Sequence, residues 1–315
     1  MKMIFFSFLS GIVCLFSASL FANELDYQLK PRRIAENTYV LIGVNEDFSV
    51  KNGGNIINTA FIVTQEGVVV IDTGPSKQYG KQLRAAIHAL TDQPIIKVLH
   101  TNSHPDRFLG NQAFLDVPRF ALAKTIEVMR EEADMLTDNL YRMVGRWMQG
   151  TEPVLPDSVI EEKQMVIGQH RLEFIALQGH TDADLVILDH HTGVLFAGGL
   201  VFFERVPTTP HAHLRQWMHA LEQLKTLKFT LMVPSHGEVV TDLSAVEQTM
   251  RYLSWLEKTL MDSVEQGESM AEVMRVALPE PFATWGVGQR EFERSVTHLY
   301  PALENDTLTA VSVVR

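Results

Sequence analysis

Cysteine is almost absent from this chain. The single cysteine among its 315 residues is Cys14, which lies in an apolar stretch close to the start. A chain processed after that stretch has no thiol at all. The sequence therefore excludes a disulfide, a thiolate metal ligand and a cysteine nucleophile in the processed protein.

Basic residues are also scarce relative to acidic ones. The chain has 27 Lys and Arg against 38 Asp and Glu, a formal net charge of -11. Removal of Lys2 with the first residues leaves 26 − 38 = −12. A surface of this charge repels phosphate backbones, so we expect no nucleic acid among the partners.

Only one long apolar run is present. It extends from Ile4 to Phe21, follows Lys2 and ends at Ala22, before the polar segment NELDYQ. This pattern predicts a signal peptide over residues 1–22, cleavage after Ala22 and export to a bacterial periplasm. The alternative is an uncleaved membrane anchor, because the run is long enough to span a bilayer. After cleavage we expect no stable membrane association.

The remaining sequence has a globular composition, and 46% of all residues are hydrophobic. Apolar runs at 37–43, 58–64 and 67–74 predict an antiparallel meander, followed by a helix between Pro75 and Pro94 and a strand at 95–100. Further strands are predicted at 119–123, 164–168, 171–177, 184–189, 194–199, 200–203 and 229–233, and helices at 124–148 and from 214. Two sheet-forming halves, each with helices on one side, predict an α+β fold, a four-layer α/β/β/α sandwich. We assign this domain to residues 23–243, and residues 244–315 to a C-terminal helical extension packed on it.

Four segments that follow predicted strands carry residue types that bind metals. They are NSHPDR (102–107), GHTDADL (179–185), FAGGL (196–200) and VPSHGE (233–238). Loops at the ends of strands commonly carry the active-site residues of such folds. We therefore expect these segments to meet in one cleft.

The order and spacing of these segments resemble the metallo-β-lactamase fold superfamily, from about Asn37 to Glu238. RVP (205–207) and the tail FERSVTHLYPALE resemble a periplasmic subgroup found alongside quinoprotein dehydrogenases and sulfur oxidation. The resemblance implies a hydrolase with its metal centre in these loops. It also implies that Asp72, in DTG (72–74), is a buried residue that supports the ligand loop.

The superfamily motif is incomplete in this chain. The pattern is H-x-H-x-D-H, a later His, a bridging Asp or Cys and a final His, which together hold two zinc ions. Four of the positions are kept, and Asn102, Arg107 and Gly199 replace the other three ligands. Asn102 could still offer an amide oxygen, whereas Gly199 offers no side chain. The kept residues are His104, Asp106, His180 and His236.

Arg107 argues against a second zinc ion. Its guanidinium stays protonated and cannot coordinate, and its charge would repel a nearby cation by several kcal/mol even at an effective dielectric constant of about 20. The resemblance and this repulsion together predict at most one zinc ion, held by three of the four kept residues and water. N-x-H-x-D-R also resembles the mono-zinc carbapenemase subclass, whose zinc is held by the equivalents of Asp106 and His236 and by a cysteine that this chain lacks.

Three functions follow from this pattern. The first is a zinc-dependent hydrolase of an ester, thioester, lactone or amide bond in a small molecule. In it Asp106 would orient the attacking water, and Arg107 would steady an oxyanion or a substrate carboxylate. The second is a protein without catalysis that binds a small anion through Arg107, or a periplasmic redox protein. The third is β-lactam hydrolysis. A salt bridge to Asp106 is the alternative role for Arg107. We expect a surface role for His211 and His213, and the alternative is that HAH (211–213) adds a metal ligand.

Overall fold

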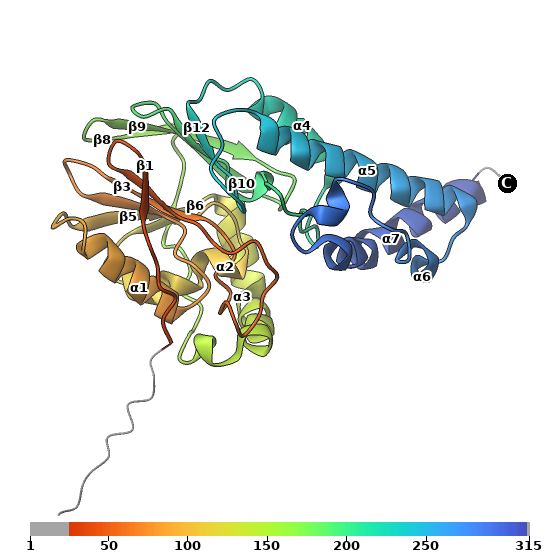
Figure 1. Cartoon of the computed structure of the whole chain (residues 1–315), viewed down its shortest axis with the longest axis horizontal. Coiled ribbons are helices and arrows are strands. Elements are labelled where there is room, and N and C mark those ends of the chain that lie inside the picture. The colour runs from red at the N-terminus through yellow and green to blue at the C-terminus, as the bar shows by residue number, and fades with distance from the viewer. Residues whose placement is uncertain (1–24, 314–315) are drawn as a thin grey trace, which may run out of the picture.

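The computed structural model describes residues 25–313. The predicted signal peptide, residues 1–22, with Cys14, lies outside the described residues. Two β-sheets pack face to face, and helices cover the outer face of each (Figure 1). The predicted α/β/β/α sandwich is confirmed.

The first sheet has seven strands in the order β1-β2-β3-β4-β5-β6-β7. Neighbouring strands from β1 to β4 are antiparallel, and those from β4 to β7 are parallel. The strands are β1 (Arg32–Ala35), β2 (Thr38–Leu41), β3 (Thr59–Val63), β4 (Val68–Ile71), β5 (Ile95–Leu99), β6 (Arg119–Ala121) and β7 (Ser158–Val159). Because β4 and β5 are parallel, their carboxyl ends lie at the same edge of the sheet, where Asp72 and the NSHPDR segment follow them.

The second sheet has five strands in the order β12-β11-β10-β9-β8. They are β8 (Gln164–Ile167), β9 (His170–Leu177), β10 (Asp184–Asp189), β11 (Val194–Phe196) and β12 (Leu231–Val233). The strand predicted at 200–203 is wrong, because Phe202 alone forms a β-bridge there, to His236. Residues 198–200 form a short 3-10 helix instead.

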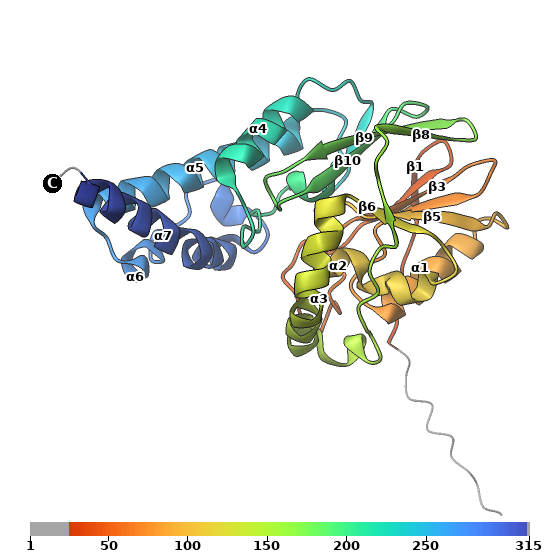
Figure 2. The ribbon, with the colours of Figure 1, turned by 180° about the vertical axis from the view of Figure 1, so that it is seen from behind.

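The core lies between the sheets and beneath the helices. Branched apolar residues such as Ile62 of β3 and Ile187 of β10 fill the space between the two sheets. Two helices, α1 (Lys77–His88) and α3 (Ala123–Val144), lie on the side of the first sheet, and α4 (Leu214–Leu224) lies on the second (Figure 2). Helix α1 begins after Ser76, whose side chain accepts a hydrogen bond from the backbone N–H of Tyr79.

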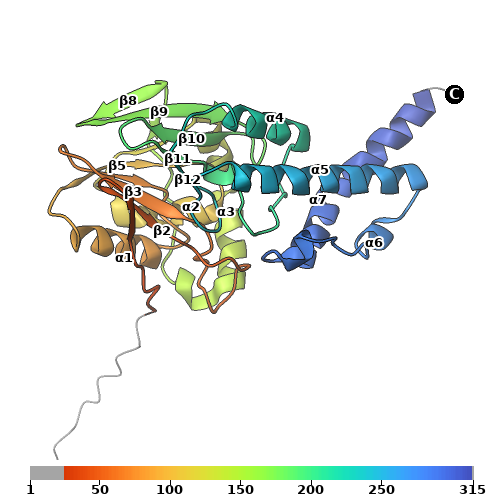
Figure 3. The ribbon, with the colours of Figure 1, turned by 45° about the horizontal axis from the view of Figure 1, so that its top comes forward.

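The C-terminal helices extend from the second sheet (Figures 1 and 3). They are α5 (Ser244–Gln266), the short α6 (Met270–Val273) and α7 (Gly288–Val313). One hydrophobic cluster joins them to the sandwich, and it contains Val186 of β10, Trp217 of α4, Tyr252 of α5 and Phe292 of α7. Among residues 25–313, no helix has both the length and the apolar character that a membrane span requires.

Candidate functional site

The four segments singled out in the sequence meet at one edge of the sandwich. Short helix α2 (Pro105–Phe108) follows β5, and His104 precedes its first residue. His180 lies in the loop between β9 and β10, and His236 in the loop after β12. His104, Asp106, His180 and His236 all line one cavity of about 580 Å³. Three distant parts of the chain therefore contribute to the same cleft.

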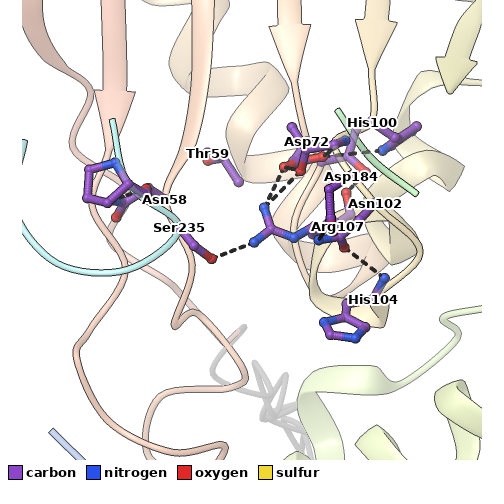
Figure 4. Close-up of polar contacts among 12 residues, drawn as sticks. Asn58, Thr59, Asp72, His100, Asn102, His104, Arg107, Asp184 and Ser235 are labelled. Carbon is purple, nitrogen blue, oxygen red and sulfur yellow. Dashed lines mark hydrogen bonds and ion pairs between the residues drawn. The ribbon is translucent and has the colours of Figure 1, made fainter. Parts of the chain in front are cut away.

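Arg107 forms a buried ion pair with Asp72. Its Nη1 donates to Oδ2 of Asp72 over 2.8 Å and to Oγ1 of Thr101 over 3.0 Å, and its Nη2 donates to Oγ of Ser235 over 2.5 Å (Figure 4). The relative exposures of Arg107 and Asp72 are 2% and 1%. The predicted alternative, a salt bridge between Arg107 and Asp106, is therefore wrong, because the partner is Asp72. The predicted role of Arg107 as an anion anchor is also wrong, because Nη1 and Nη2 bind the protein's own carboxylate and hydroxyl groups.

Asp72 supports the loop, as the resemblance implied. Besides Arg107, its carboxylate accepts the backbone N–H of Thr101 at 2.9 Å and the Thr101 hydroxyl at 2.7 Å. Burial favours a raised pKa for this carboxyl, but the charge of Arg107, the nearby His100 ring, with Nδ1 3.7 Å away, and hydrogen bonds from Thr101 hold the pKa below its usual range. The backbone of Asp72 is in the left-handed region, with φ 59°, a strained conformation that functional sites often retain.

Asn102 has a structural role. Its side-chain oxygen accepts the backbone N–H of His104 at 3.1 Å, and its side-chain nitrogen donates to Oδ1 of Asp184 over 3.3 Å. Both ends of the amide are engaged in hydrogen bonds, so Asn102 supports the loop, a role that its place in the motif, as a substituted ligand position, did not predict. The motif analysis missed Asp184, although it belongs to GHTDADL (179–185). It also accepts the backbone N–H groups of His180 and Thr181, and burial raises its pKa to about 6.

Gly199 lies where the bridging ligand was expected, and the space beside it is filled. A Cβ atom on Gly199 would lie 2.3 Å from Nδ2 of Asn102 and 2.4 Å from Cδ2 of His180. Both distances are far below a van der Waals contact. The local packing therefore has no room for a side chain that could act as the bridging ligand.

Three imidazole rings form a chain from the cleft toward the surface. Nε2 of His180 is 3.2 Å from Nδ1 of His104, and Nε2 of His104 is 3.0 Å from Nδ1 of His211. Nε2 of His211 lies 3.9 Å from Oε2 of Glu132 on α3. His211 is 38% exposed, which agrees with the expected surface position, but it also contacts a motif residue, His104. Its position beyond RVP, in HAH (211–213), was the only sequence signal for this contact.

Burial keeps the imidazoles neutral and the Asp106 carboxyl partly protonated near pH 6. Burial is the main reason that the pKa values of His104, His180 and His236 are well below 6.5, and nearby positive groups lower them further. Nδ1 of His236 is 2.7 Å from the carbonyl oxygen of Ile56, a contact that fixes its ring. Burial raises the pKa of Asp106 to about 6, although Arg107 lowers it.

These donors fit only part of a zinc site. Two nitrogen ligands of one tetrahedral zinc ion lie about 3.3 Å apart when each bond is about 2.0 Å. The distance from Nε2 of His180 to Nδ1 of His104 is close to this, at 3.2 Å. Within residues 25–313, however, no three His, Cys, Asp or Glu side chains are grouped so that they could hold a metal ion. A catalytic zinc site has three protein ligands. The described side chains therefore do not form a complete zinc site.

Met135 and Met143 of α3 add apolar surface to the cavity wall, and three arginines that were not predicted from the sequence add positive charge. These are Arg142 of α3, Arg205 in the segment before α4 and Arg294 of α7. Their motif signals are weak, because they lie on helices and loops outside the strand-end segments. The cavity thus combines buried imidazoles, guanidinium groups and an apolar side.

Comparisons with known proteins agree with this architecture. A linear primary-alkylsulfatase from a Pseudomonas species is 21% identical over 285 residues, covering 75% of this chain and 53% of the enzyme, so the chain spans about half the length of that relative. The metallo-beta-lactamase IND-1 from Chryseobacterium indologenes is 25% identical over 189 residues, 58% of this chain and 72% of that protein. A solved metallo-beta-lactamase from Pontibacter korlensis has the same fold, with a TM-score of 0.60 and 24% identity over 72% of this chain and 99% of that one.

The family assignment rests on the central part of the chain. A model of the Metallo-beta-lactamase superfamily matches residues 52–236, which is more than half of the chain. The match includes the NSHPDR segment and ends at His236, before α5 begins. With the sandwich and the cleft at its loop edge, this match shows that the chain belongs to the Metallo-beta-lactamase superfamily.

Proposed function

We propose that this chain is an exported hydrolase that cleaves an ester, thioester, lactone or amide bond in a small anionic molecule. The observation that carries the proposal is the shared cavity. His104, Asp106, His180 and His236, which come from three distant segments, line it together. Family membership supports a hydrolytic reaction, and the names of the two relatives, an alkylsulfatase and a β-lactamase, support a small substrate.

The residues of the cleft have separate roles in this proposal. Asp106 has a pKa of about 6, so near pH 7 it is mainly ionised and can accept a proton from an attacking water. His104 and His180 are the residues that would hold a single zinc ion, together with a third ligand that the described side chains do not group there. The ion would activate the attacking water. Asn102 and Asp184 hold the loops that present the two histidines.

Metal analysis of the untagged, processed protein tests the proposal. After purification in zinc-containing buffer we expect about one zinc per chain, together with hydrolysis of at least one compound in a panel of esters, thioesters, lactones and amides. His104→Ala and His180→Ala should lose both zinc and hydrolysis, whereas His88→Ala, an exposed histidine of α1, should lose neither. A zinc content near zero, with no hydrolysis restored by added zinc, would contradict the proposal.

The second candidate is a binding protein of the same fold that has lost catalysis. The incomplete grouping of metal donors favours it. Its ligand would be a small anion in the same cavity or a periplasmic redox protein. An Asp106→Ala variant separates the two candidates, because hydrolysis cannot survive the change, whereas a binding function can. Full function of the variant in cells would favour the binding protein.

Export is part of both candidates. The apolar run from Ile4 to Phe21 and the small residue Ala22 support it. The mass of the protein recovered from the periplasm should correspond to a chain that begins at Asn23. A full-length chain recovered with the membrane fraction would instead favour the anchor.

A further inference from the structure

We propose that Arg205 is the anion-binding residue of the cavity, and that the ligand is an amphipathic anion whose apolar part contacts α3. This proposal rests on the proposed function, because the ligand is taken to be the substrate that reacts in the cavity. The C-terminal helix α7 then contributes to binding.

Arg205 is a buried guanidinium that faces the cavity without an ion-pair partner. Its relative exposure is 1%, and it lines the cavity beside Asp106 and His236. Its Nη1 donates to the carbonyl oxygen of Glu46, while its Nε is buried and has no hydrogen-bond partner among the described residues. No described carboxylate forms an ion pair with it. A buried charge is costly unless it is paired, so this position favours an anionic guest.

Two of the three acidic residues near Arg205, Asp47 and Glu291, are already paired with other arginines, and the third, Asp106, lies in the cavity wall without an arginine in ion-pair distance among the described residues. Oδ2 of Asp47 lies 3.1 Å from Nε of Arg290 and 3.3 Å from Nη2 of Arg294. Oε2 of Glu291 lies 3.1 Å from Nη1 of Arg294. Helix α7 supplies Arg290, Glu291 and Arg294. Its arginines pair with Asp47 and Glu291, which leaves Arg205 without an ion pair of its own among the described residues.

Arg107 is not available as the anion-binding residue, although it belongs to the sequence motif. Its donors at Nη1 and Nη2 are used by Asp72, Thr101 and Ser235, and only its Nε, like that of Arg205, has no hydrogen-bond partner among the described residues. An incoming anion would have to compete with a buried carboxylate 2.8 Å away. Arg205 has no such competitor within ion-pair distance among the described residues.

The other wall of the cavity is apolar and lies on α3. Met135, Leu136 and Met143 line it, and Met135 and Met143 are 52% and 38% exposed. Methionine side chains are flexible and polarisable, and they adapt to aliphatic groups of different shape. The cavity volume of about 580 Å³ is in the range of small-molecule sites. A ligand with its charged head at Arg205 and its aliphatic tail on α3 contacts both the polar and the apolar wall of the cavity.

Calorimetric titration of the unmodified, metal-free protein tests the ligand class. The probes are decane-1-sulfonate, decan-1-ol and decyltrimethylammonium, which share a chain length and differ in charge. We expect the sulfonate to bind at least about 10-fold more tightly than the alcohol, because only the sulfonate can form a charge-assisted hydrogen bond with Arg205. The cation should bind most weakly. Equal affinities for sulfonate and alcohol would overturn the proposal, whatever the variants do.

Variants then test the contribution of each cavity wall to binding. Arg205→Met should weaken sulfonate binding by roughly 10- to 100-fold and leave binding of the alcohol nearly unchanged. Met135→Glu, an exposed position, should weaken the sulfonate as well. Arg130→Met and Val166→Glu are matched controls, because both residues are exposed and neither lines the cavity. Unchanged sulfonate binding in a folded Arg205→Met protein would overturn the role of Arg205.

Failure of this inference is distinguishable from failure of the proposed function. The titration uses a sulfonate, which has no ester bond, and metal-free protein, so it measures binding without turnover. Selective sulfonate binding without hydrolysis in the zinc-loaded protein would support the ligand class and contradict the hydrolase. Hydrolysis without selective sulfonate binding would do the reverse.

Discussion

Arg107 and Asp72 form an ion pair in which Nη1 and Oδ2 lie 2.8 Å apart and both side chains are almost completely buried. The pair connects α2 to the end of β4, and through Ser235 it reaches the loop after β12. The guanidinium of Arg107 thus connects loops from both sheets. In the superfamily motif, this position holds a metal ligand. The structural cost of losing this residue should therefore exceed that of an ordinary surface arginine.

Arg107→Met should lower the free energy of unfolding by about 3–5 kcal/mol, because it leaves the carboxylate of Asp72 buried without its partner. Urea unfolding followed by circular dichroism measures this. The matched control is Arg84→Met, whose partner Asp116 is 63% exposed, and the expected loss there is about 1 kcal/mol or less. The double variant Arg107→Met with Asp72→Asn should be less destabilised than the sum of the two single variants. A loss of the control's size for Arg107→Met would contradict the buried pair.

Acid should remove the contribution of Asp72 to stability. Its pKa is lowered in the folded protein from the ordinary 3.8, so its contribution is complete above about pH 4 and is lost as the pH falls through the native pKa. The difference in unfolding free energy between the natural protein and Asp72→Asn should be largest near pH 5, where Asp72 is ionised and Asp106 is mostly protonated. It should be smaller near pH 7, where the two ionised carboxylates repel each other, and should shrink below about pH 4. Urea midpoints at each pH measure it. A constant difference down to pH 3 would show that Asp72 is not the group that titrates.

Two buried carboxyls, those of Asp106 and Asp184, change the stability with pH in the direction opposite to Asp72. The pKa values of Asp106 and Asp184 are raised by burial to about 6, so the folded state holds these protons more tightly than the unfolded state does. Their ionisation therefore costs stability as the pH rises from about 4 to about 6. The comparison with Asp72→Asn removes the effect of Asp184, which both proteins keep, but not all of the effect of Asp106, because Asp72 helps to raise the pKa of Asp106.

The sandwich and its cleft could be predicted because they depend on patterns along the chain. Alternating and continuous apolar runs mark β2 to β6, and the motif residues His104 and His236 follow strand ends. The partner of Arg107 was not predictable from its own segment, since Asp106 is its neighbour in sequence but Asp72 lies nearer in space. Arg205 was missed for a similar reason, because its burial depends on how α7 packs, and neither spacing nor periodicity encodes that.

Asn102→Ala should reduce stability without changing metal content. The change leaves the backbone N–H of His104 and Oδ1 of Asp184 without a partner that each now has, which costs about 1–3 kcal/mol. Urea unfolding and zinc analysis are made on the same samples. Asn139→Ala, an exposed asparagine of α3, is the control and should change the unfolding free energy by about 0.5 kcal/mol or less. Loss of zinc from a folded Asn102→Ala protein would restore the amide oxygen as a ligand.

Restoring the missing carboxylate at position 199 should not create a second metal site. In Gly199→Asp the new Cβ would lie 2.3 Å from Nδ2 of Asn102 and 2.4 Å from Cδ2 of His180, so both side chains must move. Gly199→Ala introduces the same crowding without the charge, and overpacking of this kind costs about 1–3 kcal/mol. We expect both variants to be destabilised and neither to bind more zinc than the natural protein, because Arg107 keeps its positive charge beside the cleft. The Gly150→Ala control has no atom within 4 Å of the added Cβ, although its φ of 71° adds strain of its own. Zinc analysis and urea unfolding of the three variants decide the matter. A second zinc ion in Gly199→Asp would mean that the cleft can rearrange around a bridging ligand, and that the single missing side chain, rather than Arg107, limits the metal content.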